Sequence, residues 1–81
     1  MINKINYQYL HYFYMTAKYG GVLKAARELH ITPQTISGQI SAFEKQLGFP
    51  LFERKGRRLV LNEKGKTAFK YAQDIFSLGN E

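Results

Sequence analysis

Residues 21–47, which read GVLKAARELHITPQTISGQISAFEKQL, decide the fold of this chain. They predict two helices joined by a tight turn. Thr32 is suited to cap the second helix, because its hydroxyl can accept a hydrogen bond from a free backbone N–H of the first turn. Pro33 fits the first helical position, where no N–H is needed. The apolar residues that follow recur with helical spacing and form one stripe. This stripe consists of Ile36, Ile40, Phe43 and Leu47.

The face opposite this stripe is polar and carries no acidic residue. It contains Gln34, Thr35, Ser37, Gly38, Ser41 and Lys45. Most of these side chains can donate or accept hydrogen bonds, so the face is suited to lie against a polar partner. Two helices joined by a tight turn are also typical of the helix-turn-helix, whose second helix enters the major groove of DNA. We therefore interpret residues 32–47 as a DNA-recognition helix.

The composition indicates one small, ordered domain. The chain has 81 residues, 44% of them hydrophobic, and no cysteine, which excludes disulfides and thiolate metal sites. Neither His11 nor His30 has a ligand partner at metal spacing, and no nucleophile–base constellation is present. We therefore expect no metal, no cofactor and no enzymatic activity. Without a membrane-length apolar run or a recognisable signal peptide, the chain is expected to be a cytoplasmic protein of the bacterial type, with no membrane contact.

Positive charge is concentrated toward the end of the chain. The net charge is +6, and seven of the twelve Lys and Arg residues lie between Arg54 and Lys70, where Glu63 is the single acid. A scattered charge of this size would indicate only a solvated surface. The clustering favours a polyanionic partner, nucleic acid above all.

Two further helices are expected before the recognition helix. Asn6 can cap a first helix over residues 7–18, whose apolar residues follow helical spacing. Gly20 and Gly21 interrupt that helix, and the next one is expected over residues 22–30. It contains a pair of alanines, which are small enough to let it cross the recognition helix closely.

A short hairpin is expected after the recognition helix. Residues 51–53 and 59–61 are predominantly apolar, and the loop 54–58 between them reads RKGRR. A glycine in the middle of a short basic loop between apolar runs is typical of a hairpin with a charged tip. Added to a helix-turn-helix, such a hairpin is a wing.

The chain ends in an amphipathic helix that Asn62 can cap. Its apolar stripe has little left to cover in so small a domain, so we expect it to pair with its copy in a homodimer. The expected contacts are Ala68, Phe69, Ala72, Ile75 and Phe76. The predicted fold is mainly α, with a winged helix-turn-helix DNA-binding domain (three helices and a two-stranded β wing) over 1–62 and a long linker and dimerisation helix over 63–81.

The order of these elements resembles the N-terminal DNA-binding domain of LysR-type transcriptional regulators. The matching residues are Leu10-x-x-Phe13, Ala25-Ala26-x-x-Leu29, Ser37-x-x-Ile40, Glu44-x-x-Leu47-Gly48, Leu51-Phe52-x-Arg54 and Gly65. The resemblance covers nearly the whole chain and implies a homodimer that binds a partly palindromic operator in double-stranded DNA. It also implies a C-terminal effector-binding domain, absent from this chain, as the place where any small-molecule or ion effector acts.

A closer resemblance within the family is carried by the strings INYQYLHYF, TPQTISGQI and RKGR. These segments resemble those of LysR-type regulators that activate sodium/proton antiporter expression. The resemblance implies that this protein regulates antiporter or osmotic-stress genes.

Three departures from the common family pattern are present in the sequence. The usual Ser-Gln-Pro at the helix start is here Thr32-Pro33-Gln34, the arginine often found after the helix serine is Gly38, and the serine that usually starts the second helix is Gly21. The first two departures change which bases are read, so no family operator sequence can be carried over.

The expected DNA contacts lie at the start of the recognition helix and on the wing. They are Thr32, Pro33, Gln34, Thr35, Ser37, Gly38 and Ser41 on the helix, and Arg54, Lys55, Arg57 and Arg58 on the wing. The alternative is a winged-helix module that binds protein without reading DNA sequence. That alternative predicts an exposed apolar patch beyond the last helix, which the sequence does not reveal. RNA binding is disfavoured because the recognition face lacks stacking aromatic residues.

Overall fold

The structure, a computed structural model, describes residues 6–79. Its elements are α1 (Tyr7–Tyr19), α2 (Val22–Leu29), α3 (Pro33–Leu47), β1 (Phe52–Lys55), β2 (Arg58–Leu61) and α4 (Glu63–Gly79), with β1 and β2 paired in one antiparallel sheet. The prediction of a mainly α winged helix-turn-helix followed by a long helix is confirmed. Over residues 6–79, no helix combines the length and the apolar character needed to cross a lipid bilayer.

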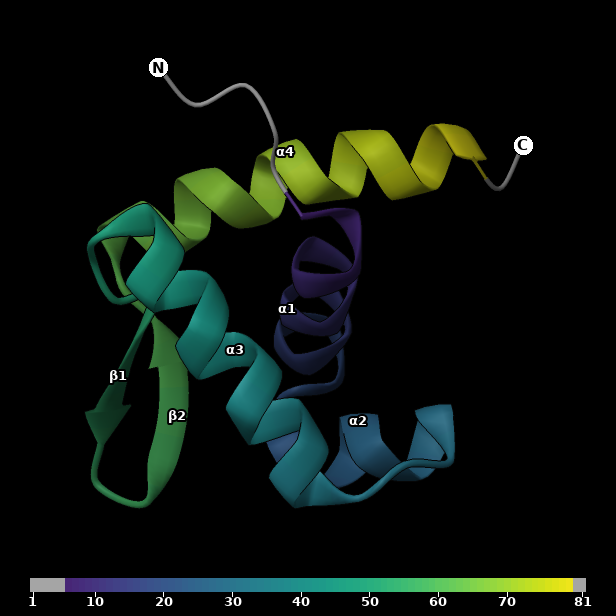
Figure 1. The fold of residues 1–81 in the computed structure, drawn as a ribbon. Helices are drawn as coiled ribbons and strands as arrows, with labels where there is room; N and C mark the ends of the chain where they lie inside the picture. The colour runs from purple at the N-terminus through teal and green to yellow at the C-terminus, as the bar shows by residue number, and fades with distance from the viewer. Residues whose placement is uncertain (1–5, 80–81) are drawn as a thin grey trace.

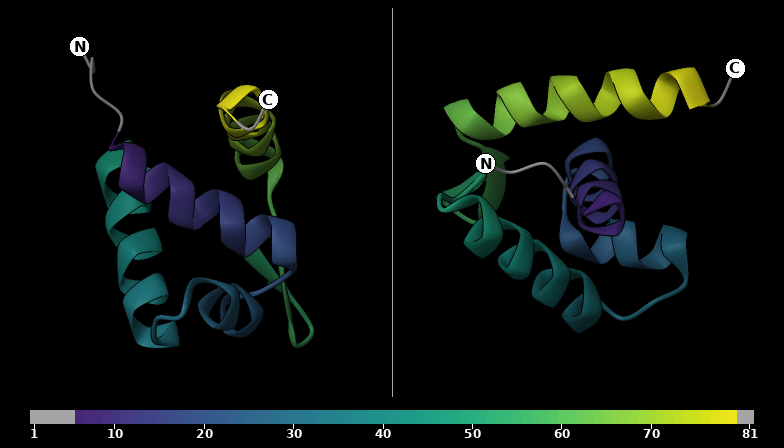
Figure 2. Two further views of the ribbon diagram at one scale, coloured as in Figure 1. Left: turned by 90° about the vertical axis from the view of Figure 1, so that its right-hand side faces the viewer. Right: turned by 45° about the horizontal axis from the view of Figure 1, so that its top comes forward.

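Helix α1 is the element on which the other helices pack. It contacts α2, α3 and α4, and α4 lies across it (Figure 1). The α2–α3 pair and the hairpin of β1 and β2 extend away from α4. As a result, the tip of the hairpin and the start of α3 lie at the end of the molecule opposite α4 (Figures 1 and 2).

The core consists of two connected apolar clusters. In the first, Phe13 of α1 and Phe43 of α3 are almost fully buried, with ring centroids 6.0 Å apart. The second lies between α2 and α3, where Ala25 and Ala26 are buried at the helix crossing. Phe52, at the start of β1, packs against both clusters. The hairpin is therefore anchored in the same core as the helix-turn-helix.

The three predicted N-caps are confirmed. The side chains of Asn6, Thr32 and Asn62 each accept a hydrogen bond from the backbone N–H three residues later, at 3.0, 3.1 and 2.7 Å. The hydroxyl of Thr32 also pairs with the hydroxyl of Thr35 at 2.8 Å. The first turn of α3 is thus held by both the backbone and a side chain of Thr35.

The second helix ends one residue earlier than predicted. His30 adopts the left-handed conformation with φ +60°, and its N–H donates to the carbonyl oxygen of Arg27, so α2 ends at Leu29. A residue with a side chain is disfavoured in this conformation by about 1–2 kcal/mol. Packing compensates for this cost, because the next residue, Ile31, packs against the cluster between α2 and α3.

The hairpin is longer than predicted. Lys55 at the end of β1 pairs with Arg58 at the start of β2, so the predicted loop 54–58 shortens to Gly56 and Arg57. Gly56 has φ +66°, whereas Arg57 lies outside the left-handed region. This is the pattern of a type II′ turn, which needs only two residues and suits the twist of a hairpin. The strands can therefore pair up to the turn.

Hydrogen bonds attach the base of the hairpin to α3 and α4. The backbone N–H of Leu51 donates to the Glu44 carboxylate on α3 at 2.7 Å, and the Leu51 carbonyl oxygen accepts from the backbone N–H of Asn62 at 3.0 Å. The side-chain amide of Asn62 also donates to the Pro50 carbonyl oxygen at 2.9 Å. These bonds fix the position of the wing relative to α3.

Helix α4 starts so close to this segment that it needs a glycine. Gly65 is buried in the first turn of α4, and a Cβ atom at this position would collide with the carbonyl oxygen of Leu51 and crowd the side chain of Leu61. The absence of a side chain allows this close approach between backbones.

The expectation that the apolar stripe of α4 has little to cover within the domain is wrong. Ala72 is fully buried, and the rest of the stripe packs on the cluster around α1. The reason is the aromatic surface of α1, where Tyr14 stacks on Phe69 with centroids 5.5 Å apart.

We expect Gly65→Ala to lower the free energy of unfolding by about 1–3 kcal/mol, because the new methyl group would collide with a backbone oxygen fixed by hydrogen bonds. Urea unfolding measures this change. Lys70→Ala, at an exposed position of the same helix, is the matched control and should shift the value by less than about 0.5 kcal/mol. Equal stability of Gly65→Ala and the unaltered chain would contradict the close approach.

We expect Thr32→Val to lower the free energy of unfolding by about 1 kcal/mol, because valine keeps the shape of threonine but cannot accept the hydrogen bond from Thr35. Thr32→Ser retains the hydroxyl, so its free energy of unfolding should fall clearly less than that of Thr32→Val. Thermal unfolding of both variants checks this. A loss of stability in Thr32→Ser with none in Thr32→Val would show that the methyl group of Thr32, and not its cap, stabilises α3.

Candidate nucleic-acid interface

The polar face of α3 is open to solvent. Ile36, Ile40 and Phe43 are buried in the core, as predicted, and the opposite face is exposed. The exposed positions among the expected contacts are Thr32, Gln34, Thr35, Ser37, Gly38 and Ser41, and Pro33 is half buried. A partner can therefore reach this face without any rearrangement of the helix.

Two further cations lie on the helix that precedes α3. Lys24 and Arg27 are exposed on α2, which lies beside the start of α3 (Figure 1). Both cations are open to an anionic partner.

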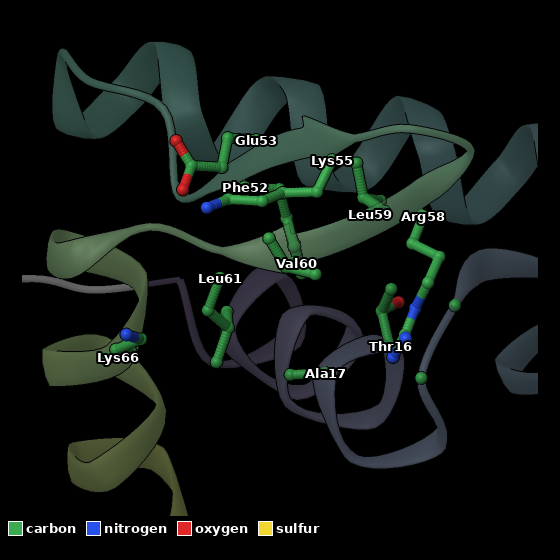
Figure 3. A pocket seen from close by; sticks show the side chains of 12 residues that line it. Thr16, Ala17, Phe52, Glu53, Lys55, Arg58, Leu59, Val60, Leu61 and Lys66 are labelled. Atoms are coloured by element: carbon green, nitrogen blue, oxygen red, sulfur yellow. The ribbon is translucent and has the colours of Figure 1, made fainter.

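The four expected wing contacts are all exposed but do not share one face of the hairpin. Lys55 and Arg58 are direct cross-strand partners, so their side chains lie on the same face, and alternation along β1 puts Arg54 on the other face. Arg57 lies in the turn. Figure 3 shows Arg58 extending toward Thr16 at the end of α1, whereas Lys55 extends back along β1.

A hollow of about 540 Å³ separates the hairpin from the end of α1. Lys55, Arg58 and Lys66 line it together with apolar residues of β2 (Figure 3). In the sequence, the wing cations form the single run RKGRR, which does not reveal this division. The division depends on strand alternation counted from the turn, and the sequence did not reveal where the turn begins.

The positive charge of the wing is not neutralised within the described part of the chain. There, the one ion pair joins Lys66 and Glu63, 3.6 Å apart and exposed to solvent. The cations of the hairpin make no ion pair with an acid of residues 6–79. Their charge is available to an anionic partner.

The start of α3 and the tip of the wing lie at the same end of the molecule, and α4 lies at the opposite end (Figures 1 and 2). The fold thus places at one end of the molecule two groups of residues that are about twenty positions apart in the sequence. The residues expected in the dimer contact lie on the other side.

The expected dimer contacts on α4 are partly covered by α1. Ala72 is fully buried in the core and has no surface for a partner, which corrects its assignment. The other four residues are half buried. The ring centroid of Phe76, for example, lies 5.1 Å from that of Tyr7 and 5.2 Å from that of His11. Tyr71, which was not among the expected contacts, is 53% exposed on the same helix.

Comparison with known proteins confirms the predicted family. A family model described as "Bacterial regulatory helix-turn-helix protein, lysR family" matches residues 7–66. The transcriptional activator protein NhaR of Escherichia coli (strain K12) is 46% identical over 80 residues, which are 99% of this chain and 27% of NhaR. The HTH-type transcriptional regulator YwqM of Bacillus subtilis (strain 168), itself uncharacterised, is 39% identical over 69 residues, which are 85% of this chain and 24% of YwqM. The chain spans about a quarter of the length of these curated relatives.

Solved structures share the fold. A crystal structure of the BenM DBD with catB site 1 DNA has a TM-score of 0.85 and 29% sequence identity, covering 93% of this chain and 83% of that chain. A crystal structure of a CbnR DBD–DNA complex has a TM-score of 0.81 and 32% identity, covering 93% of this chain and 86% of that chain. Since the family model matches most of its length, the chain belongs to the lysR family of bacterial regulatory helix-turn-helix proteins.

Proposed function

We propose that this chain is the sequence-specific DNA-binding part of a transcription regulator. One observation carries the proposal: the acid-free polar face at the start of α3 and the basic hairpin tip lie at the same end of the molecule. Double-stranded DNA offers a major groove to such a helix and phosphates to such a hairpin. The solved structures of BenM and CbnR contain DNA, which supports the proposal.

In the proposed complex, α3 enters the major groove with its first turns against the base edges. Gln34 is exposed and is suited to pair with adenine through N6 and N7. The hydroxyl of Thr35 is already paired with that of Thr32, which leaves the methyl group of Thr35 for contact with a thymine methyl. Gln34 and Thr35 are therefore the proposed base-reading residues.

The wing, in this proposal, contributes affinity more than sequence reading. Arginine and lysine side chains on a hairpin are suited to phosphates or to a narrow A·T-rich minor groove, where negative potential is concentrated. Because Arg54 and the pair Lys55 and Arg58 lie on different faces, they would contact different phosphates.

For the whole protein we propose a LysR-type regulator of which residues 1–62 form the DNA-binding domain and residues 63–81 the linker helix. The chain spans 27% of NhaR, and a small-molecule or ion effector would act through a domain outside this chain. Similarity to NhaR supports sodium/proton antiporter or osmotic-stress genes as the targets. Such a regulator would act in the bacterial cytoplasm and needs no enzymatic activity and no cofactor.

We also propose a homodimer formed through α4. Support comes from the apolar surface that α4 retains after packing on α1, which includes Ala68, Phe69, Ile75 and Phe76 as half-buried residues and Tyr71 as an exposed one. Two copies would present two α3 helices to half-sites about 34 Å apart or a multiple of that distance. The operator would then be partly palindromic.

We expect Gln34→Ala to weaken binding to the preferred duplex by about 1–3 kcal/mol and to relax one base position. Selection of binding sites from random duplex DNA, with sequencing, measures both effects in the unaltered chain and the variant. Ile40→Ala is the control for unfolding, because core truncation costs about 2–5 kcal/mol and should weaken binding to all sequences alike. An unchanged base preference in Gln34→Ala would refute the role of Gln34 in base reading.

We expect Lys55→Ala and Arg57→Ala each to weaken binding to all sequences by the same factor. Loss of one phosphate contact should lower the slope of log affinity against log salt concentration by about one. Titrations at several salt concentrations measure this slope. A variant that altered base preference at an unchanged slope would instead assign its side chain to base reading.

We expect two copies of the chain to bind one selected duplex. Sedimentation of the complex, with a duplex that carries a single half-site as control, measures the stoichiometry. The single half-site should bind much more weakly, because the second copy then has no DNA contact. One copy per duplex at saturation, with equal affinity for both duplexes, would rule out the dimer.

A further inference from the structure

A glycine in the middle of the recognition helix is unfavourable for that helix. Gly38 lies within α3, between Ser37 and Gln39, and is exposed to solvent. In an exposed helix interior, glycine is less stabilising than alanine because it loses more backbone freedom on folding. The helix on which DNA reading depends therefore carries a residue that weakens it.

The chain itself offers no reason for this glycine. Gly20, Gly48 and Gly56 have φ of +81°, +89° and +66°, which favour glycine, and Gly65 is required by the carbonyl oxygen of Leu51. By contrast, Gly38 has helical backbone, and a Cβ atom at its position would meet no atom within 4 Å. The space for a side chain is open in the free protein.

Gly38 lies at the centre of the face that is proposed to contact DNA. Helical spacing puts it one turn after Gln34 and one turn before Ser41, and both neighbours are exposed. A side chain at this position would stand between α3 and any partner of this face. Because Gly38 has no Cβ atom, a partner can approach the helix backbone closely, which is a known use of glycine.

We propose that Gly38 is a specificity-determining residue, because the edge of a base pair approaches α3 at this position more closely than a Cβ atom would allow. The inference rests on the proposed function. Residues four apart on a helix lie about 5–6 Å from each other, so Gly38 faces the base pairs next to the one read by Gln34. The cations suited to phosphates lie away from Gly38, on the hairpin, at Lys24 and Arg27 of α2, and at Lys45 two turns later on α3.

Gly38→Ala tests the proposal, because stability and binding should move in opposite directions. Alanine favours the helix, so the Tm of the 81-residue chain should rise by roughly 4–8 °C. Affinity for the duplex selected by the unaltered chain should fall about tenfold or more. Selection repeated with the variant should return a changed preference at a base pair next to the one that Gln34 reads.

Two control variants separate the Cβ atom from helix stability. Gly38→Ser also adds a Cβ atom, but serine is a weaker helix former than alanine. The Tm should therefore rise less than in Gly38→Ala, while the loss of DNA affinity remains. Gln73→Ala, at an exposed position of α4, should raise helix propensity without changing DNA affinity.

Three results would overturn the proposal, and they can be told apart. If the unaltered chain selects a duplex and Gly38→Ala binds it equally well, no close approach exists at this position. If Gly38→Ala loses affinity for every sequence by the same factor, a sugar or phosphate and not a base edge lies there. If the unaltered chain selects no sequence, the proposed function itself fails, and the role of Gly38 fails with it.

Discussion

The backbone of Leu51 is the constraint on which the geometry of the recognition surface depends. Its N–H is bonded to Glu44 of α3, its carbonyl oxygen accepts from Asn62 at the start of α4, and Gly65 packs against the same carbonyl. A buried backbone group without a partner costs about 1–3 kcal/mol, so the hairpin cannot tilt away from α3 without a substantial loss. The direction of the wing relative to the recognition helix is therefore fixed by residues that are not themselves expected to touch DNA.

Local signals predicted most of the fold, and non-local contacts account for what was missed. The caps at Asn6, Thr32 and Asn62 could be predicted because each depends on a side chain and a backbone N–H three residues apart. The burial of Ala72 could not, because helical periodicity identifies an apolar stripe but not what covers it. The tight turn before α3 was predicted, but the left-handed conformation of His30 was not, because packing of the next residue compensates for a conformation that is unfavourable for histidine.

The residue types of the candidate site could be predicted, but their arrangement could not. The charges at Arg54, Lys55 and Arg58 form one run in sequence, yet they divide between two faces because each strand alternates from the turn outward. The position of that turn depends on the conformation of Gly56. In the same way, the residue type alone does not tell why glycine occurs at Gly38 and at Gly65. Only the structure shows that one is pressed against a carbonyl oxygen and that the other faces open space.

Helix α1 connects the recognition helix to the proposed dimer helix through aromatic rings. Phe13 packs on Phe43 of α3 with ring centroids 6.0 Å apart. The adjacent Tyr14 stacks on Phe69 of α4 with ring centroids 5.5 Å apart. Because buried rings pack at near-crystalline density, α3 has little freedom to reorient relative to α4 within one chain. In the proposed dimer, the separation of the two recognition helices would then follow from how the two α4 helices cross. One added base pair rotates a half-site by roughly 35° about the DNA axis, so a dimer of this kind would select half-site spacing as well as base sequence.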